Sequence, residues 1–376
     1  MDKTKFNADS KIFDYAVIGS SPLMLLEAIS LAKDGFKVCI LDRDFQNGGS
    51  WKTHNLENHF DIEIACHVIE VFPKVYDYLS ESSGVPFVTL KEQPIRVNKY
   101  GFIFTYSSKI LIILAGIRLL FGYIHSKIIS HISKNFNKNI LLNYASKLES
   151  FWKYQTPIIF SKTEMKGPQF GFVDLLNNLV FKCESLGIEI KKFDVDSLHH
   201  KLDHWEISCK KGNLLSSKKI SSTTSTNLRQ KKKGVFESVE YKMIKRKSVV
   251  IEISKDDVFR YQSYVAFWKD PFVTRISRID QKKQYESKLI YLVEIKNINT
   301  DNLDLLNKIL RKALLKAKII KKSSSFINMG LINCNYTENA EQLPQGIIDK
   351  GFTCYYSYGN LAAGIARWLN LKKNER

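Results

Sequence analysis

The sequence lacks the features that identify several common protein classes. Its six cysteines, at positions 39, 66, 183, 209, 334 and 354, form no C-x-x-C pair, so neither a zinc site nor a dithiol redox motif is predicted. Scattered thiols of this kind are typical of reduced cysteines in a cytosolic protein. The first ten residues are polar and charged, which argues against a signal peptide there. We therefore expect a cytoplasmic protein that binds no metal.

Acidic residues are few relative to basic ones. Lys and Arg number 57 against 38 Asp and Glu, a formal net charge of +19. Such an excess favours anionic partners: nucleotides, nucleotide sugars, nucleic acid or an anionic membrane surface. A lysine-rich composition without functional meaning explains the charge equally well. No nucleic-acid recognition motif accompanies the charge, so a specific nucleic-acid partner is not expected.

Long uninterrupted apolar runs are also missing. The most apolar segment, residues 109–132, is interrupted by Arg118, whereas a membrane span requires about 18 or more apolar residues. The segment predicts a buried or partly exposed helix. A surface-bound amphipathic helix is the alternative, because basic residues lie nearby. That alternative would add a peripheral contact with the inner face of the membrane to the expected cytoplasmic location.

The residues that are present organise the chain around a unit between residues 15 and 53. An apolar run ends at Gly19, apolar residues at helical spacing follow from 22 to 33, and a second apolar run ends at Asp42. Strand, turn, helix and parallel strand form a βαβ unit. The positive end of the helix suits a phosphate, and Asp42 could accept hydrogen bonds from a ribose. Asp42 follows Gly19 by 23 residues, close to the spacing of about 20 in dinucleotide sites.

The glycine fingerprint of such sites is incomplete. Ser20 follows Gly19, Ser21 occupies the second glycine position, and Met24 occupies the third. The second glycine normally admits the pyrophosphate, and the third allows close helix–strand packing. Ser21 could donate its hydroxyl, whereas Met24 predicts a slightly displaced helix. A βαβ unit that has lost its ligand is the competing interpretation.

Other segments add candidate site residues. The paired glycines in residues 48–51 would let a loop pass close to a ligand, and residues 359–361 form a second strand–glycine–helix junction. Residues 221–234 are rich in Ser, Thr and then Lys, and predict a loop or linker. Arg275 and Arg278 offer planar forks for phosphate or carboxylate, or else form surface ion pairs. The segments that predict an antiparallel sheet are 249–253, 264–268, 273–278 and 288–295.

On these motifs the chain resembles the flavin-binding oxidoreductases that include amine oxidases, protoporphyrinogen oxidase, phytoene desaturase and UDP-galactopyranose mutase. The resemblance rests on the βαβ opening with its following paired glycines, on residues 359–361, and on the turn–helix–strand pattern of 167–190. Two shorter matches are similar to the mutase branch: residues 65–67, in place of a G-x-H loop that lies against the flavin, and residues 271–278.

The resemblance implies FAD as cofactor, with NAD(P)H as a candidate reductant. It implies that His67 approaches the flavin ring and is the best candidate for a catalytic group, with a packed or solvent-facing histidine as the alternative. The substrate-binding residues that it implies are Arg275, Arg278, Tyr355 and Tyr356. The cofactor-binding residues that it implies are Gly19, Ser20, Ser21, Asp42, Arg43, Gly48, Gly49, Ser50, Trp51, Gly359, Asn360 and Leu361.

The expected fold class is α/β: a Rossmann-like FAD/NAD(P)-binding domain with a parallel sheet, plus an inserted antiparallel-sheet and helical substrate domain. The first would comprise residues 1–85, 160–248 and 330–376, and the second residues 86–159 and 249–329. The expected function is FAD-dependent oxidation or reduction of a small organic or sugar-nucleotide substrate. The alternatives are a flavin-dependent nucleotide-sugar mutase or glycan-biosynthesis enzyme, and a non-catalytic Rossmann-fold protein without its cofactor.

Overall fold

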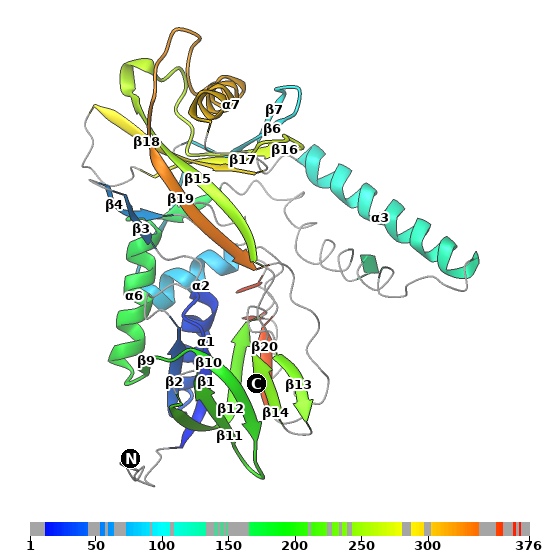
Figure 1. Ribbon diagram of the computed structural model, residues 1–376, viewed down its shortest axis with the longest axis vertical. Coiled ribbons are helices and arrows are strands. Elements are labelled where there is room, and N and C mark those ends of the chain that lie inside the picture. The colour runs from blue at the N-terminus through cyan, green and yellow to red at the C-terminus, as the bar shows by residue number, and fades with distance from the viewer. Residues whose placement is uncertain are drawn as a thin grey trace.

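The structure is a computed structural model in which two β-sheets lie at opposite ends of the long axis (Figure 1). All structural statements below concern the residues that it describes. These are residues 12–43, 53–56, 59–63, 73–90, 92–105, 109–132, 140, 144–145, 148, 165–209, 212–223, 228–232, 235–238, 243–279, 287–296, 302–337, 351–355, 364–365 and 368–369.

The predicted βαβ unit forms the centre of the first sheet. It consists of β1 (Phe13–Ile18), α1 (Pro22–Lys33) and β2 (Val38–Asp42). β1 and β2 pair in parallel, with Tyr15 opposite Val38 and Ile18 opposite Leu41. Every residue of β2 is buried, as expected of a strand whose two faces are both covered.

The first sheet combines parallel and antiparallel strands. Its order is β13-β14-β10-β11-β12-β1-β2-β9, and β20 pairs with β12. β12 runs parallel to both β1 and β20, and β2 runs parallel to β9, whereas β10, β11 and β12 form an antiparallel meander. The further strands are β9 (Glu189–Lys192), β10 (Val195–His200), β11 (Trp205–Cys209), β12 (Leu214–Thr223), β13 (Leu228–Lys232), β14 (Val235–Ser238) and β20 (Phe352–Tyr355).

The predicted loop over residues 221–234 is wrong in its described part. β12 continues to Thr223, and β13 occupies Leu228–Lys232. Ser221 and Ser222 are fully buried, because β12 is enclosed between β1 and β20 at this point. Their hydroxyl-rich composition suggested a loop, but small side chains with hydrogen-bond partners are compatible with a central strand.

Three helices cover one face of this sheet. α1, α2 (Pro73–Ser83) and α6 (Phe172–Ser185) share one apolar core with the sheet. The stripe of α6 that enters this core recurs every three or four residues, which is the helical period. It comprises Phe172, Leu175, Leu176, Leu179, Val180 and Cys183.

The second sheet has the order β19-β15-β18-β17-β16-β6-β7. One face packs on α7 (Leu303–Lys316) through Leu306, Leu310 and Leu314. A short 3₁₀ turn, η2 (Lys255–Asp257), follows β15. The strands are β6 (Ile95–Asn98), β7 (Ile103–Thr105), β15 (Met243–Ser254), β16 (Tyr264–Trp268), β17 (Val273–Arg278), β18 (Lys288–Ile295) and β19 (Ile327–Thr337).

β15 and β19 pair with each other from Met243 and Thr337 onward. The chain therefore changes sheets between Ser238 and Met243, and it leaves the second sheet only after Thr337. Both points lie several residues away from the expected domain boundaries at 248 and 330.

Two small ribbons complete the fold. One pairs β5 (Phe87–Thr89) with β8 (Lys166–Pro168). The other pairs β3 (Thr53–Leu56) with β4 (His59–Glu63), and it lies between the second sheet and α6 (Figure 1). Ile62 of β4 is buried against Val250, Leu292 and Ile332 of the second sheet. The β3–β4 ribbon therefore joins the second sheet to the helical layer of the first.

One further helix, α3 (Lys109–Ile132), extends away from the body of the molecule (Figure 1). It follows β7 at the edge of the second sheet. A 20-residue part, Ile113–Ile132, is long and apolar enough to cross a membrane by its length and composition, and only 6% of this stretch is buried.

Candidate functional site

The candidate site lies where β1 and β2 end and α1 begins. Gly19 occupies the turn with φ +95°, a conformation that glycine adopts without strain. Its N–H donates to the carbonyl oxygen of Leu41 at 2.8 Å, which connects the ends of the two strands. Among the described residues, no heavy atom lies within 4 Å of the place where a Cβ would stand, so this part of the chain leaves the turn open on the side that a ligand would approach.

Asp42 is held in place by the residue that follows this glycine. The Ser20 N–H donates to Oδ2 of Asp42 at 3.1 Å, and the Ser20 hydroxyl donates to the same oxygen at 2.5 Å. Ser20 is fully buried and Asp42 nearly so. These two hydrogen bonds orient the carboxylate at the carboxyl end of β2, where a ribose hydroxyl would be recognised.

Ser21 is the N-cap residue of α1, but its side chain does not cap the helix. Its Oγ is buried and has no hydrogen-bond partner within the part of the chain that the structure describes. A buried hydroxyl without a partner costs about 1–3 kcal/mol, so such a group points to a ligand that would satisfy it. The positive end of α1 makes a phosphate the natural ligand.

The starts of α6 and α7 are arranged differently. Oε1 of Glu63 accepts the N–H groups of Phe172 and Val173, at 2.9 and 3.0 Å, at the start of α6. Oδ1 of Asn302 accepts the Leu305 N–H at the start of α7. At both helix N-termini, a side-chain oxygen of the protein therefore accepts the free N–H groups. In a phosphate-binding terminus, a phosphate oxygen does so instead.

Met24 tests whether the unit fits a dinucleotide. Its side chain is fully buried and belongs to the apolar core that also contains Val17 and the α6 stripe. The residue at the third glycine position has thus become part of the core. The open turn at Gly19, the buried hydroxyl of Ser21 and the oriented carboxylate of Asp42 fit a pyrophosphate and its ribose.

A second set of polar residues lies on the face of the second sheet that packs against Ile62. Arg275 and Glu294 are cross-strand neighbours on β17 and β18, and Nε of Arg275 lies 2.7 Å from Oε2 of Glu294. The Glu294 side chain is 3% exposed. Ser277 lies two residues further along this face, and its buried Oγ has no hydrogen-bond partner among the described residues.

The same face continues across the sheet to Arg96. Ala266 of β16 is opposite Arg275 on one side and opposite Arg96 of β6 on the other. Residues opposite one another in a sheet project from the same face. The row therefore places two arginines and one glutamate on a single face.

Arg278 lies on the other face of β17. It is opposite Tyr291, whose neighbours Val293 and Leu289 belong to the core beneath α7. Its Nη1 lies 3.9 Å from Oε2 of Glu92. The structure therefore does not bring together the two arginines that were predicted to bind one substrate.

The sequence-based reasoning missed a buried carboxylate, Glu27 of α1. It is 1% exposed and accepts hydrogen bonds from Trp368 Nε1 at 2.6 Å and from Ser221 Oγ at 3.3 Å. The sequence did indicate its burial, because Glu27 is the one acidic residue in a helix whose neighbouring residues are mostly apolar. Glu27 connects α1 to β12 and to the helical residues at the end of the chain.

The remaining predicted site residues are placed only in part. Arg43 directly follows β2, and Tyr355 ends β20. No group of three His, Cys, Asp or Glu side chains suited to a metal occurs in the described part. The predicted residues that lie outside it are Gly48, Gly49, Ser50, Trp51, His67, Tyr356, Gly359, Asn360 and Leu361.

Comparison by sequence finds no matching family model and no matching curated protein. Comparison by structure finds proteins similar over nearly their whole length. An oxidoreductase from Methanosarcina mazei matches with a TM-score of 0.59 and 12% identity, over 95% of this chain and 99% of that one. Putrescine oxidase bound to putrescine matches with a TM-score of 0.55 and 10% identity, over 97% and 100%. Rab GDI from Plasmodium falciparum matches with a TM-score of 0.53 and 11% identity, over 95% and 96%.

These similarities establish the fold. The chain has an α/β fold similar to that of these solved structures, which include putrescine oxidase and another oxidoreductase. At such low identity a shared fold does not establish a shared activity.

Proposed function

We propose that this protein binds FAD at the β1–α1–β2 unit and is an oxidoreductase that acts on a small organic substrate. The observation that carries the proposal is the buried Ser21 hydroxyl, which has no partner in the described structure and lies at the N-terminus of α1. The similarity in fold to an oxidoreductase and to putrescine oxidase supports it.

Each residue of the unit has a distinct part in binding. Gly19 leaves room for the pyrophosphate, since no atom of the described residues stands where its Cβ would be. Ser21 Oγ and the first turn of α1 would donate hydrogen bonds to it. Asp42, oriented by Ser20, would accept from the adenosine ribose. The flavin supplies the electron-transfer chemistry when bound, and the chain supplies binding and orientation.

The substrate would lie against the face of the second sheet that contains Arg275. With Arg96, Arg275 and Glu294 in one row, this face has more basic than acidic groups. An anionic group on the substrate, such as a carboxylate, suits that balance. The nucleotide-sugar mutase is the weaker alternative, because it would use Arg275 and Arg278 together and these project from opposite faces.

The direct test is the cofactor content of the purified protein. We expect a yellow protein with a flavin absorption spectrum, or a colourless one that takes up added FAD. Asp42→Ala should weaken FAD binding roughly tenfold or more, because it removes a charged acceptor that contributes about 1.5–3 kcal/mol.

Asp14→Ala is the matched control. Asp14 also accepts one backbone N–H, from Lys37 at 2.9 Å, and one side-chain donor, from Lys218 at 2.8 Å. It lies at the opposite end of β1, so FAD binding should be unchanged. A protein that takes up no FAD would contradict the proposal and leave the interpretation as a non-catalytic Rossmann-fold protein.

A further inference from the structure

Helix α3 presents a continuous apolar stripe to solvent. At about 100° per residue, its eight exposed large apolar side chains fall within a sector roughly 120° wide. The exposed fraction of these side chains reaches 67% at Phe121 and 79% at Ile132. The stripe comprises Ile113, Leu114, Ile117, Leu120, Phe121, Ile124, Ile128 and Ile132.

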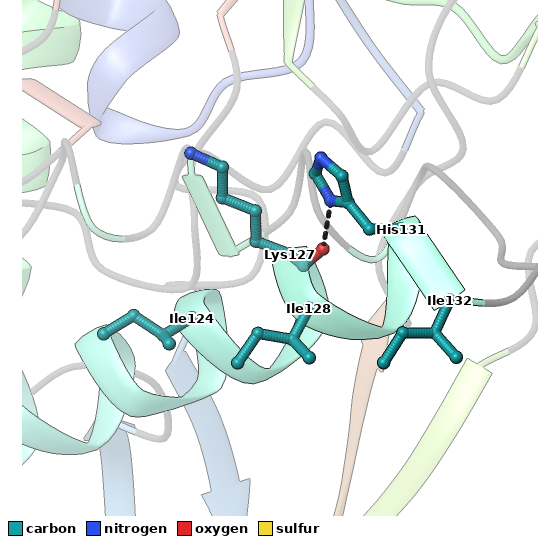
Figure 2. A pocket seen from close by; sticks show the side chains of 5 residues that line it. All are labelled: Ile124, Lys127, Ile128, His131 and Ile132. Carbon is teal, nitrogen blue, oxygen red and sulfur yellow. Dashed lines mark hydrogen bonds between the residues drawn. The ribbon is translucent and has the colours of Figure 1, made fainter.

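Figure 2 shows the arrangement near the C-terminal end of the helix. Ile124, Ile128 and Ile132 project to one side, and Lys127 and His131 project to the other. Together these five side chains line a shallow hollow along the helix surface. Nδ1–H of His131 donates a hydrogen bond of 2.8 Å to the Lys127 carbonyl oxygen, which holds the ring beside the helix backbone.

Basic side chains border the stripe. Arg118 lies along one edge and Lys127 along the other, by their positions around the helix, whereas His131 falls within the sector of the stripe. Arg118 and Lys127 are exposed, and α3 contains no Asp or Glu. An apolar face bordered by cationic side chains is the pattern of a helix that lies in the headgroup region of an anionic bilayer.

The opposite side of α3 packs on the protein. The Tyr144 ring lies so close to Gly122 that a side chain there would overlap it, and Ser126 is buried. The chain therefore covers the opposite side of α3 at Gly122 and Ser126, which favours a helix that lies on a bilayer over one that spans it.

A second copy of this chain suits the stripe less well. Ile113, Ile117, Leu120 and Ile124 are spaced four, three and four residues apart, as in a coiled-coil seam. Continuing that spacing brings Lys127 and His131 into the seam. Two parallel helices packed this way would bring the two Lys127 ammonium groups together.

We propose that α3 is a docking surface for an anionic lipid bilayer, with its apolar stripe inserted among the acyl chains and its flanking basic residues at the headgroups. The net charge of +19 adds a general attraction to the same surface. The proposal is independent of flavin binding, since α3 contributes nothing to the β1–α1–β2 unit.

Flotation of the full-length protein with lipid vesicles tests the proposal. We expect the protein to float with vesicles that contain phosphatidylglycerol and phosphatidylcholine, and to float less as salt is raised. With pure phosphatidylcholine vesicles, binding should be roughly tenfold weaker. A protein that stays unbound with both vesicle types at low salt would overturn the proposal.

Phe121→Glu and Phe181→Glu form a matched pair. Both phenylalanines lie on helices, at 67% and 68% exposure, but Phe181 belongs to α6. Phe121→Glu should lower vesicle binding roughly tenfold, and Phe181→Glu should leave it unchanged. Equal effects of the two substitutions would contradict the proposal. The proposal would also be contradicted if the wild-type protein bound no vesicles and instead formed a dimer without lipid that Phe121→Glu dissociates.

Discussion

The indole Nε1 of Trp368 donates a hydrogen bond of 2.6 Å to Oε2 of Glu27, across 341 residues of sequence. Glu27 lies on the first helix of the chain, and Trp368 lies among its last described helical residues. Both are 1% exposed. The contact holds the end of the chain against α1, whose N-terminus forms the candidate nucleotide site.

Removing the indole donor should destabilise the protein measurably. Trp368→Phe keeps an aromatic ring near Tyr78, whose ring centroid is 5.3 Å away, but leaves a buried carboxylate oxygen without this donor. We expect the free energy of unfolding to fall by about 1–3 kcal/mol in urea denaturation. Glu27→Gln should also destabilise the protein, whereas Glu184→Gln, on the exposed face of α6, should change stability by less than about 0.5 kcal/mol. Equal stability of all three variants would show that the contact is unimportant.

Arg275 and Glu294 should be energetically coupled. Both are largely buried, with side chains 15% and 3% exposed, so replacing either by Ala leaves the other charge without its partner. A double-mutant cycle should give a coupling free energy of about 2 kcal/mol or more. The exposed pair Lys201–Glu206, at 3.1 Å, is the control and should give about 0–1 kcal/mol. Similar coupling free energies in the two double-mutant cycles would contradict the assignment of Arg275 and Glu294 as a buried ion pair.

Asp270 should make stability depend on acid pH. Burial raises the pKa of this carboxyl, but hydrogen bonds from Lys316 and from the N–H groups of Phe272 and Val273 outweigh burial and lower it below 3.8. The stabilisation is therefore complete above the unfolded value of 3.8 and is lost as the pH falls through the lower, folded pKa.

The corresponding variant is Asp270→Asn. It should be less stable than wild type by about 2 kcal/mol at neutral pH, because it loses the charged partner of Lys316. The difference should shrink in urea denaturation at about pH 3. Asp256→Asn, an exposed carboxyl in η2, should show no such trend. A pH-independent difference for Asp270→Asn would argue against the predicted linkage.

The Cys183 thiol should be unreactive in the folded protein. Burial, together with the nearby Glu184 charge, raises its pKa to about 12, and the side chain is inaccessible within the core of α1 and α6. Iodoacetamide followed by peptide mass spectrometry should leave Cys183 unmodified in native protein and alkylate it in urea. Rapid alkylation without denaturant would be inconsistent with the packing described.

Local pattern was enough to predict the central unit. The periodicity of residues 22–33 gave the bounds of α1, and the run at 273–278 gave those of β17. Each pattern depends on residues a few positions apart, which share one element and one face. The order Gly19, α1, Asp42 was predictable for the same reason.

Contacts between distant segments could not be predicted in this way. Nothing near Glu27 in the sequence indicates Trp368, and the burial of Ser221 depends on β20 arriving from residue 352 onward. The placement of Arg275 and Arg278 on opposite faces was predictable from the sequence, because residues three apart in a strand project from opposite faces.

The most direct test of the account compares FAD binding in Gly19→Ala and Gly212→Ala, by titration of the purified apoprotein. Both glycines have positive φ, +95° and +83°, and neither has an atom of the described residues within 4 Å of its Cβ position. The two substitutions should therefore strain the chain by a similar amount, about 1–2 kcal/mol. If the turn after β1 holds the pyrophosphate, Gly19→Ala should weaken FAD binding roughly tenfold or more, and Gly212→Ala should leave it at the wild-type value. Equal FAD affinities for the two variants, or no FAD binding by the wild-type protein, would contradict the account.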